Sequence, residues 1–134
     1  MSELKNQISQ FIDTNAKNYQ DISLAIHAKP EVSDFEYFAS QTLSEQLKKE
    51  GFEIELPAAG HRTGFAATYK SNKLGPTVAF LAEYDALAGL GHGCGHNVFG
   101  ATSSLAGAAL KSVVDQIGGE VRVYGTPGEE GGQN

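Results

Sequence analysis

The sequence has a single cysteine and no long apolar run. One cysteine cannot form an internal disulfide, so Cys94 is a buried core residue, a metal ligand or a nucleophile. No apolar stretch approaches the roughly 20 residues that a membrane-spanning helix needs. The N-terminal segment is polar and charged where a secretory signal would be apolar. These absences predict a soluble protein with a cytoplasmic location.

Positive charge is scarce in this sequence. It carries 10 lysines and arginines against 16 aspartates and glutamates, a formal net charge of -6. A surface of this sign repels nucleic acid and anionic membranes, so we expect neither as a partner. From Leu74 onward the only cations are Lys111 and Arg122, which predicts a C-terminal half that attracts cations.

Glycine is scarce in the first half of the chain, because 12 of the 16 glycines lie between Asp85 and Asn134. A helix and a strand must also fit into that region, so most of these glycines are expected in loops. The length of 134 residues and the apolar content of 40% are typical of one globular domain with a real core.

Apolar periodicity predicts two helical regions and a hairpin in the first half. Residues 3–27 show near-helical spacing, which predicts one long helix or two short ones. Ser33 followed by Glu36 is typical of a capping box and predicts the start of another helix, which ends near Gly51. Alternating residues at 52–56 and 64–69 predict two strands that pair as a hairpin.

A strand, a helix and a strand follow. The apolar run at residues 76–82 is too short for a helix and predicts a central strand covered on both faces. Residues 98–117 predict a buried helix and residues 120–125 another strand. This βαβ order predicts an α/β fold with an α/β/α layered sheet and parallel strands. Ligands bind beyond the carboxyl ends of such strands, so the loops at 83–97 and 126–134 should meet there.

Cysteine and histidine gather in the first of these loops. The segment GHGCGH offers His92, Cys94 and His96, separated by single glycines. Imidazole and thiolate together suit zinc. The spacing is not that of a structural zinc site, which has four ligands in paired CxxC-type motifs, so it favours a catalytic site. Two alternatives stay open: ordinary buried or surface roles, and a Cys–His nucleophilic pair. Nearby carboxylates argue against the pair because they raise the pKa of a thiol.

Both loops contain carboxylate side chains. Glu129 and Glu130 follow the last strand, and neighbouring extended residues point in different directions. One can bind a metal while the other moves a proton, which is hydrolytic chemistry; the alternative is two solvated loop charges. Asp85 can accept the free ring N–H of a ligating histidine, and Glu83 can do likewise. A plain role at the strand end is the alternative for both.

Four segments carry a family resemblance: Pro30-Glu31, LAEYDAL at residues 81–87, GHGCGHN at residues 91–97, and GTPGEEGG at residues 125–132. Together, in this order and at these intervals, they resemble the M20 family of zinc metallopeptidases and amidohydrolases, and within it the amidohydrolase branch. That family includes aminoacylases, carboxypeptidases and dipeptidases. The chain departs from it at two backbone positions, with Ala88 in place of the usual proline and Gly128 in place of the usual alanine.

The resemblance implies a two-metal hydrolase that cleaves an amide bond in N-acyl amino acids or small peptides. It implies that Cys94, His96 and Glu130 are metal ligands, that Glu129 is the general base and acid, and that Asp85 orients a ligand. Zinc is the expected metal, and manganese, nickel or cobalt suit the same ligands.

Members of that family are much longer than this chain. We therefore expect residues 1–134 to be the N-terminal part of a zinc-peptidase-type catalytic domain that lacks the lid domain and is inactive alone. The full-length protein is expected to be a homo-oligomer. An exposed apolar sheet face or edge should mark where the rest of the domain is missing. The alternative is a non-catalytic folded fragment with at most one weak metal site.

Overall fold

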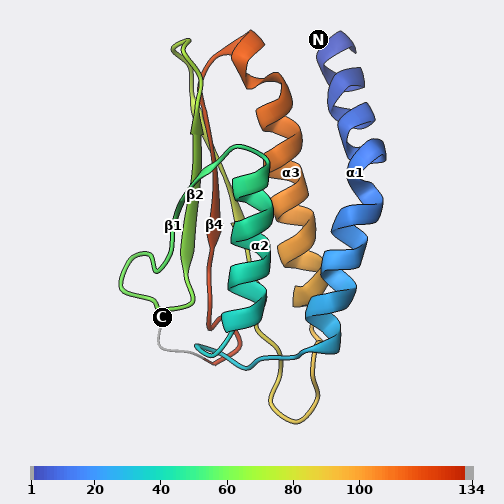
Figure 1. Cartoon of the computed structure of the whole chain (residues 1–134), viewed down its shortest axis with the longest axis vertical. Coiled ribbons are helices and arrows are strands. Elements are labelled where there is room, and N and C mark those ends of the chain that lie inside the picture. Colours follow the sequence, from blue (N-terminus) through green and yellow to red (C-terminus); the bar gives the residue numbers. More distant parts are fainter. Residues whose placement is uncertain (1, 132–134) are drawn as a thin grey trace.

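The computed structural model describes residues 2–131 (Figure 1). The first helix is continuous, as one of the two sequence-based alternatives predicts. No helix within the described residues is long and apolar enough to cross a membrane. The elements are α1 (Ser2–Ala28), α2 (Tyr37–Lys49), β1 (Glu53–Glu55), β2 (Phe65–Lys70), β3 (Thr77–Ala82), α3 (His96–Ile117) and β4 (Glu120–Gly125).

The strands form one mixed sheet in the order β1-β2-β4-β3. β1 and β2 pair antiparallel, which confirms the predicted hairpin, and β2 pairs antiparallel with β4. β3 and β4 pair in parallel, with Thr77 opposite Glu120 and Ala82 opposite Gly125, so the predicted βαβ unit is confirmed. The fold class is α/β, and the carboxyl ends of β3 and β4 lie at the same edge of the sheet.

β3 lies at the edge of the sheet among the described residues, so the prediction of a central strand covered on both faces is wrong for them. Val78 is 39% exposed and Leu81 is 53% exposed. The apolar run shows that this strand is suited to burial on both faces, but the elements packed around the strand determine which of its side chains are buried.

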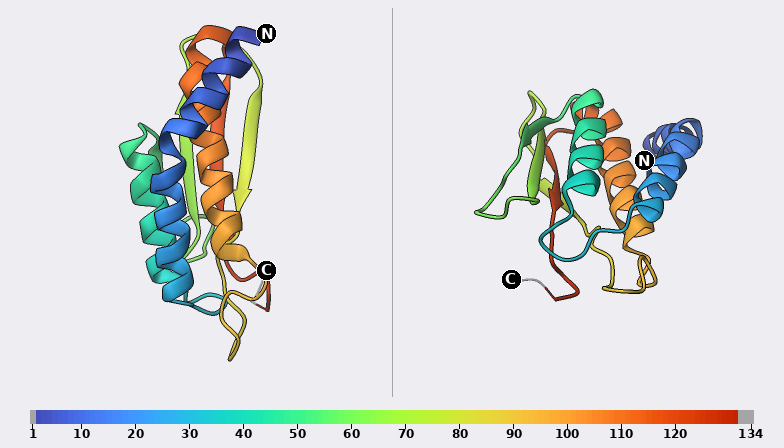
Figure 2. Two further views of the ribbon diagram at one scale, coloured as in Figure 1. Left: turned by 90° about the vertical axis from the view of Figure 1, so that its right-hand side faces the viewer. Right: turned by 60° about the horizontal axis from the view of Figure 1, so that its bottom comes forward.

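α3 joins the two parallel strands and packs on one face of the sheet, with α2 beside it and α1 outside α3 (Figures 1 and 2). The helix approaches the sheet closely because residue 107 is glycine: a Cβ atom at Gly107 would lie 2.3 Å from Cγ2 of Val123. A single apolar core fills the space between this face and the helices. It includes Ile26, Leu43, Leu47, Phe65, Ala67, Val121 and Val123.

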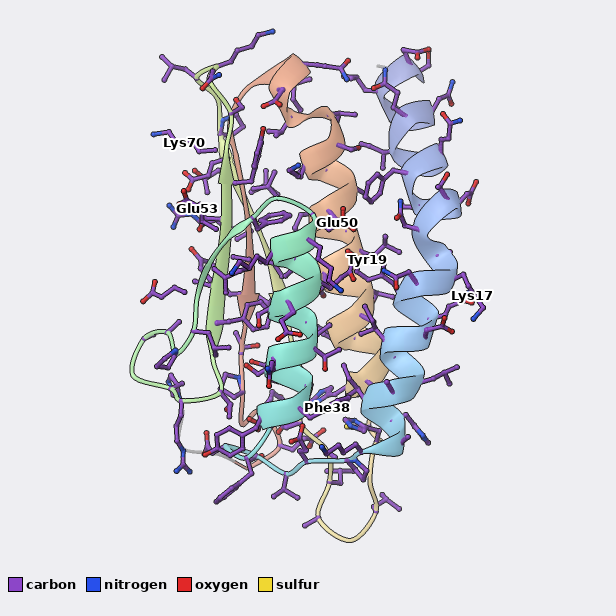
Figure 3. The ribbon with its side chains drawn as sticks, in the orientation of Figure 1. Lys17, Tyr19, Phe38, Glu50, Glu53 and Lys70 are labelled. Atoms are coloured by element: carbon purple, nitrogen blue, oxygen red, sulfur yellow. The ribbon has the colours of Figure 1, made fainter. Side chains whose placement is uncertain are left out.

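α1 docks onto the other helices through one buried stripe, formed by Tyr19, Ile22 and Ile26. The Tyr19 hydroxyl donates a hydrogen bond of 3.2 Å to Oε1 of Glu50, directly after α2 (Figure 3). Burial and this neighbouring carboxylate raise the pKa of Tyr19 above its usual range. The tyrosine therefore remains a neutral hydrogen-bond donor that ties α1 to the end of α2.

The opposite face of the sheet carries no helix from residues 2–131 (Figure 2). A groove of about 770 Å³ runs along it, and its lining includes Ala66, Thr68, Leu81, Arg122 and Tyr124. Within the described residues, this exposed, partly apolar face and the open β3 edge confirm the predicted exposed apolar sheet surface. The second helical layer of an α/β/α arrangement does not lie in the described part of the chain.

α2 is capped by a different residue from the one predicted. Glu36 makes no side-chain cap, and Ser33 donates its hydroxyl to a buried aspartate of the site described below. The Glu31 carboxylate instead accepts the backbone N–H groups of Phe38 and Ala39, both at 2.9 Å. The capping-box prediction is wrong because a carboxylate from the α1–α2 link, Glu31, already satisfies these helix N–H groups.

Replacing Glu31 with alanine removes the acceptor for two helix N–H groups, so we expect the free energy of unfolding to fall by about 1–2 kcal/mol. Glu45→Ala, on the exposed side of α2, is the matched control and should change it by less than about 0.5 kcal/mol. Urea unfolding followed by circular dichroism measures both values. Equal losses in the two variants would contradict the capping role of Glu31.

Candidate metal centre

Three segments meet beyond the carboxyl ends of β3 and β4, at the lower end of the molecule in Figure 1. They are the segment from residue 83 to residue 95, the segment from residue 126 to residue 131, and the link between α1 and α2. The Ala86 N–H donates to the Glu31 carbonyl at 2.8 Å, and the Glu130 N–H donates to the Asp85 carboxylate at 2.8 Å. The predicted meeting of the two loops is confirmed, while residues 132–134 of the second loop lie outside the described residues.

His96 is at the centre of the cluster. It is the first residue of α3, two positions before the predicted start, and the glycine before it has a φ of 85°. His96 is only 7% exposed. Its Nδ1 lies 2.9 Å from Oδ1 of Asp85, and its Nε2 lies 2.8 Å from Oε2 of Glu83. Carboxylate oxygens of Glu129 and Glu130 lie 3.8 and 3.9 Å from the same Nε2.

Asp85 contacts His96 through Nδ1 of the imidazole ring. Its carboxylate is fully buried and accepts the Ser33 hydroxyl and the backbone N–H of Glu130, each at 2.8 Å. Both its carboxylate and its main-chain carbonyl face Nδ1 of His96. These acceptors favour a hydrogen on Nδ1 and leave Nε2 available to a ligand, which is the arrangement that the predicted orienting role requires.

Glu83 differs from Asp85 in the nitrogen that it contacts. It faces Nε2, so it lies on the side of His96 from which an ion would approach. Burial raises the pKa of Glu83; His96 opposes that rise, and Glu129 and Asp85 add to it. Within residues 2–131, neither lysine nor arginine forms an ion pair with Glu83, Asp85, Glu129 or Glu130. Concentrated negative charge of this kind is stabilised by a bound cation.

Two sets of donor atoms converge on His96. The Cys94 thiol, a His96 ring nitrogen and a Glu130 carboxylate oxygen lie within 4.8 Å of one another, and the same holds for Glu83, His96 and Glu129. Such separations suit an ion whose bonds to nitrogen, oxygen and sulfur are about 2.0–2.3 Å long. The three ligands predicted from the sequence are therefore brought together, and the donor chemistry fits a divalent transition metal.

Cys94 has the surroundings of a ligand and not those of a free nucleophile. Its Sγ contacts the main-chain carbonyl of Asp85 at 3.7 Å. Burial raises the pKa of the thiol, and Glu130 raises it further. The raised pKa lowers the fraction of thiolate at neutral pH in the absence of a metal ion, which disfavours nucleophilic catalysis by a Cys–His pair.

His92, which the sequence also offers as a ligand, lies outside both donor sets. It is 8% exposed, neither ring nitrogen has a hydrogen-bond partner in the described residues, and its ring lies 6.3 Å from that of His27. Burial lowers its pKa, and His27 lowers it further. His61 lines the groove on the uncovered sheet face and belongs to neither donor set.

Sequence reasoning did not predict the contacts that polar residues make behind the loops. Besides Glu31 and Ser33, these residues are Glu36 and Thr63, both completely or almost completely buried. The Thr63 hydroxyl donates to Glu36 at 2.6 Å. The signals in the sequence are the Pro30-Glu31 segment of the family resemblance and the Ser33–Glu36 pattern, which by itself predicts a local cap.

The fold and the cluster define an α/β protein with a candidate catalytic metal centre at the carboxyl edge of its parallel strands. No family model matches the chain. The chain is 35% identical to one of the subunits of p-aminobenzoyl-glutamate hydrolase from Escherichia coli, with 98% of this chain and 31% of that protein covered. It is 36% identical to Xaa-Arg dipeptidase of Mus musculus, with 96% of this chain and 33% of that protein covered. The chain belongs to the M20 family of peptidases and amidohydrolases and spans about a third of the length of these curated relatives.

Solved structures share the fold. A protein of methicillin-resistant Staphylococcus aureus, described as an aminohydrolase, matches with a TM-score of 0.81 and 28% identity, over 93% of this chain and 35% of that one. A dinuclear metal-binding peptidase of the M20 family from Bacillus subtilis matches with a TM-score of 0.69 and 24% identity, over 88% of this chain and 36% of that one. The second likeness concerns the fold alone.

Asp85→Asn should weaken metal binding by about 10- to 100-fold, because the amide presents a donor where either His96 or the Glu130 N–H needs an acceptor. Ser33→Ala removes only the third contact of the same carboxylate and is the control, with an expected change of a few-fold at most. Titration with Co²⁺, followed by visible absorption, measures both affinities. Asp85→Asn with the parent affinity would rule out the orienting role.

Proposed function

We propose that residues 1–134 form the N-terminal part of the catalytic domain of a metal-dependent hydrolase that cleaves an amide bond in N-acyl amino acids or small peptides. One observation carries the proposal: Cys94, His96 and Glu130 bring a thiol, an imidazole and a carboxylate within 4.8 Å of one another. Three protein ligands with room for a further ligand are typical of catalytic zinc sites. The names of the two relatives, one a hydrolase of p-aminobenzoyl-glutamate and one a dipeptidase, support this substrate class.

Cys94, His96 and Glu130 are the proposed ligands of one divalent ion, with zinc as the expected metal and manganese, nickel or cobalt as others that suit these donors. Glu83 lies beside the same histidine nitrogen and is placed to contact a second ion of a two-metal site. A bound ion supplies Lewis-acid polarisation of the amide carbonyl and lowers the pKa of a water molecule. Asp85 keeps the His96 ring oriented throughout.

Glu129 is the proposed proton carrier. Its side chain is 53% exposed, and Oε2 lies 3.8 Å from Nε2 of His96, so it borders the ligand set and reaches solvent. In the proposed reaction, Oε2 accepts a proton from the attacking water, whose oxygen forms the new bond to the carbonyl carbon. The C–N bond then breaks, and Glu129 returns the proton to the leaving nitrogen.

The chain of 134 residues alone is proposed to be inactive, because a two-metal site needs ligands beyond the donors that it supplies. The second candidate is a non-catalytic folded fragment with at most one weak metal site, which does not form part of a working hydrolase. The short span relative to the curated relatives favours it. Metal content of the isolated chain and amidase activity of the complete protein distinguish the two candidates.

In the complete protein, Glu129→Gln should retain the metal and lower kcat by about 10²- to 10⁴-fold, because an amide cannot accept the proton of water. Glu130→Gln should instead lower the metal content, because an amide is a poorer ligand than a carboxylate. Metal analysis and hydrolysis of a panel of N-acyl amino acids and dipeptides measure both effects.

The opposite pattern, in which Glu129→Gln loses metal and Glu130→Gln keeps it, would show that the two roles are reversed. Full activity in the presence of a chelator, abolished only by Cys94→Ser, would establish the cysteine nucleophile and refute the metal-dependent reaction.

Metal affinity should rise with pH through neutrality. The Cys94 thiol must lose its proton to ligate the ion, and burial and Glu130 raise the pKa of this thiol. At neutral pH, metal binding therefore releases the thiol proton, and a higher pH favours that release and so favours binding. Co²⁺ titrations between about pH 6 and pH 8 measure the slope. Cys94→Ser should flatten it, and an equal slope in parent and variant would exclude thiolate ligation.

A further inference from the structure

Glu36 is a completely buried carboxylate that belongs to neither donor set. It lies directly before α2 and has three hydrogen-bond donors. Its Oε1 accepts the N–H of Asp34 at 2.6 Å and the N–H of Gly128 at 3.2 Å, and its Oε2 accepts the Thr63 hydroxyl at 2.6 Å. The donors come from the α1–α2 link, from the residues before β2 and from the loop after β4.

The bond to Gly128 connects Glu36 with the metal centre. Gly128 directly precedes Glu129 and Glu130, and it has a φ of 74°. On the far side of Glu129, the backbone N–H of Glu130 is held by the buried carboxylate of Asp85. The main chain is therefore fixed by a buried carboxylate on each side of Glu129, although the Glu129 side chain itself is free to reach solvent.

Only one of the three donors to Glu36 lies next to the proposed ligands and proton carrier. The bonds to Asp34 and Thr63 join parts of the framework, and they would be present in a purely structural carboxylate. The Gly128 bond spans 92 positions in the sequence and ends one residue before the proposed proton carrier. This difference between the donors makes the function of Glu36 testable.

We propose that Glu36 is a positioning residue, whose bond to the Gly128 N–H places the Glu129–Glu130 backbone against His96. The inference rests on the proposed function, since it assigns Glu36 to the same site. Groups that hold a ligand or a proton carrier in place affect metal affinity and turnover without touching substrate. Glu36 acts in this way through the main chain.

The test uses three variants in the complete protein. Glu36→Met keeps an unbranched side chain of similar length and removes every acceptor. Glu36→Gln keeps one oxygen for the Gly128 and Asp34 N–H groups and turns its amide toward the Thr63 oxygen, which can accept. Thr63→Val removes only the framework donor to Oε2 and is the matched control for lost stability.

Glu36→Met should lower Co²⁺ affinity and kcat by about 10- to 100-fold with little change in KM, and should alter the visible spectrum of bound Co²⁺. Glu36→Gln should restore the spectrum and most of the activity. Thr63→Val should be less stable to urea yet keep the parent spectrum and kcat. Parent-like kcat and spectrum in Glu36→Met, or equal losses in Glu36→Met and Thr63→Val, would overturn the proposal.

Hydrogen exchange of the backbone amides provides a measurement that depends on neither metal nor activity. In the metal-free protein, the Gly128 amide should be protected in the parent and in Thr63→Val, and unprotected in Glu36→Met. If Glu36→Met does not fold, Glu36→Asp, which draws the carboxylate back by one methylene, should show the same loss to a smaller degree. Unchanged protection in the folded variant would overturn the inference.

Failure of the proposed function gives a different result. A complete parent protein that binds no Co²⁺ and hydrolyses no amide would refute the metal-dependent hydrolase, whatever the exchange data show. Loss of Gly128 protection in Glu36→Met would then still establish that Glu36 holds this loop, whereas the positioning of a catalytic site would be refuted together with the hydrolase.

Discussion

The site depends on the contacts of the buried Asp85 carboxylate. It accepts a hydroxyl hydrogen from Ser33, which lies between α1 and α2, and a backbone N–H from Glu130, after β4. It also faces the ring of His96 at the start of α3. Burying a carboxylate without such partners is strongly unfavourable, so the three segments stabilise one another through Asp85. The hydrogen bonds that satisfy Asp85 thus also determine where the candidate ligands lie.

A parallel strand pair makes this arrangement achievable. Because β3 and β4 run in the same direction, the loops after Ala82 and Gly125 start side by side. The acidic side chains of both loops then gather around one imidazole, and burial and mutual repulsion raise the pKa of Glu83. The same crowding that destabilises the metal-free cluster favours a bound cation.

Local patterns predicted the elements well. Apolar spacing located α1 and α3 to within about two residues, and alternation located the β1–β2 hairpin. Two local interpretations were wrong. The capping box failed because the acceptor for the α2 N–H groups is Glu31, and the central position of residues 76–82 failed because β3 has a neighbour on one side only in the described residues. Both depend on contacts that the local pattern does not contain.

By itself, the sequence determined the order of strand, helix and strand and the residue types in the loops that follow, since these depend on periodicity and composition. From them follow the α/β fold and the gathering of Cys94, His96 and Glu130 at one edge. Only the tertiary structure decided which nitrogen of His96 faces Asp85 and that Glu36 is buried beneath Gly128. The physical reason is that burial and hydrogen bonding join residues far apart in the sequence, such as Glu36 and Gly128 at a separation of 92 positions, and no local pattern encodes such contacts.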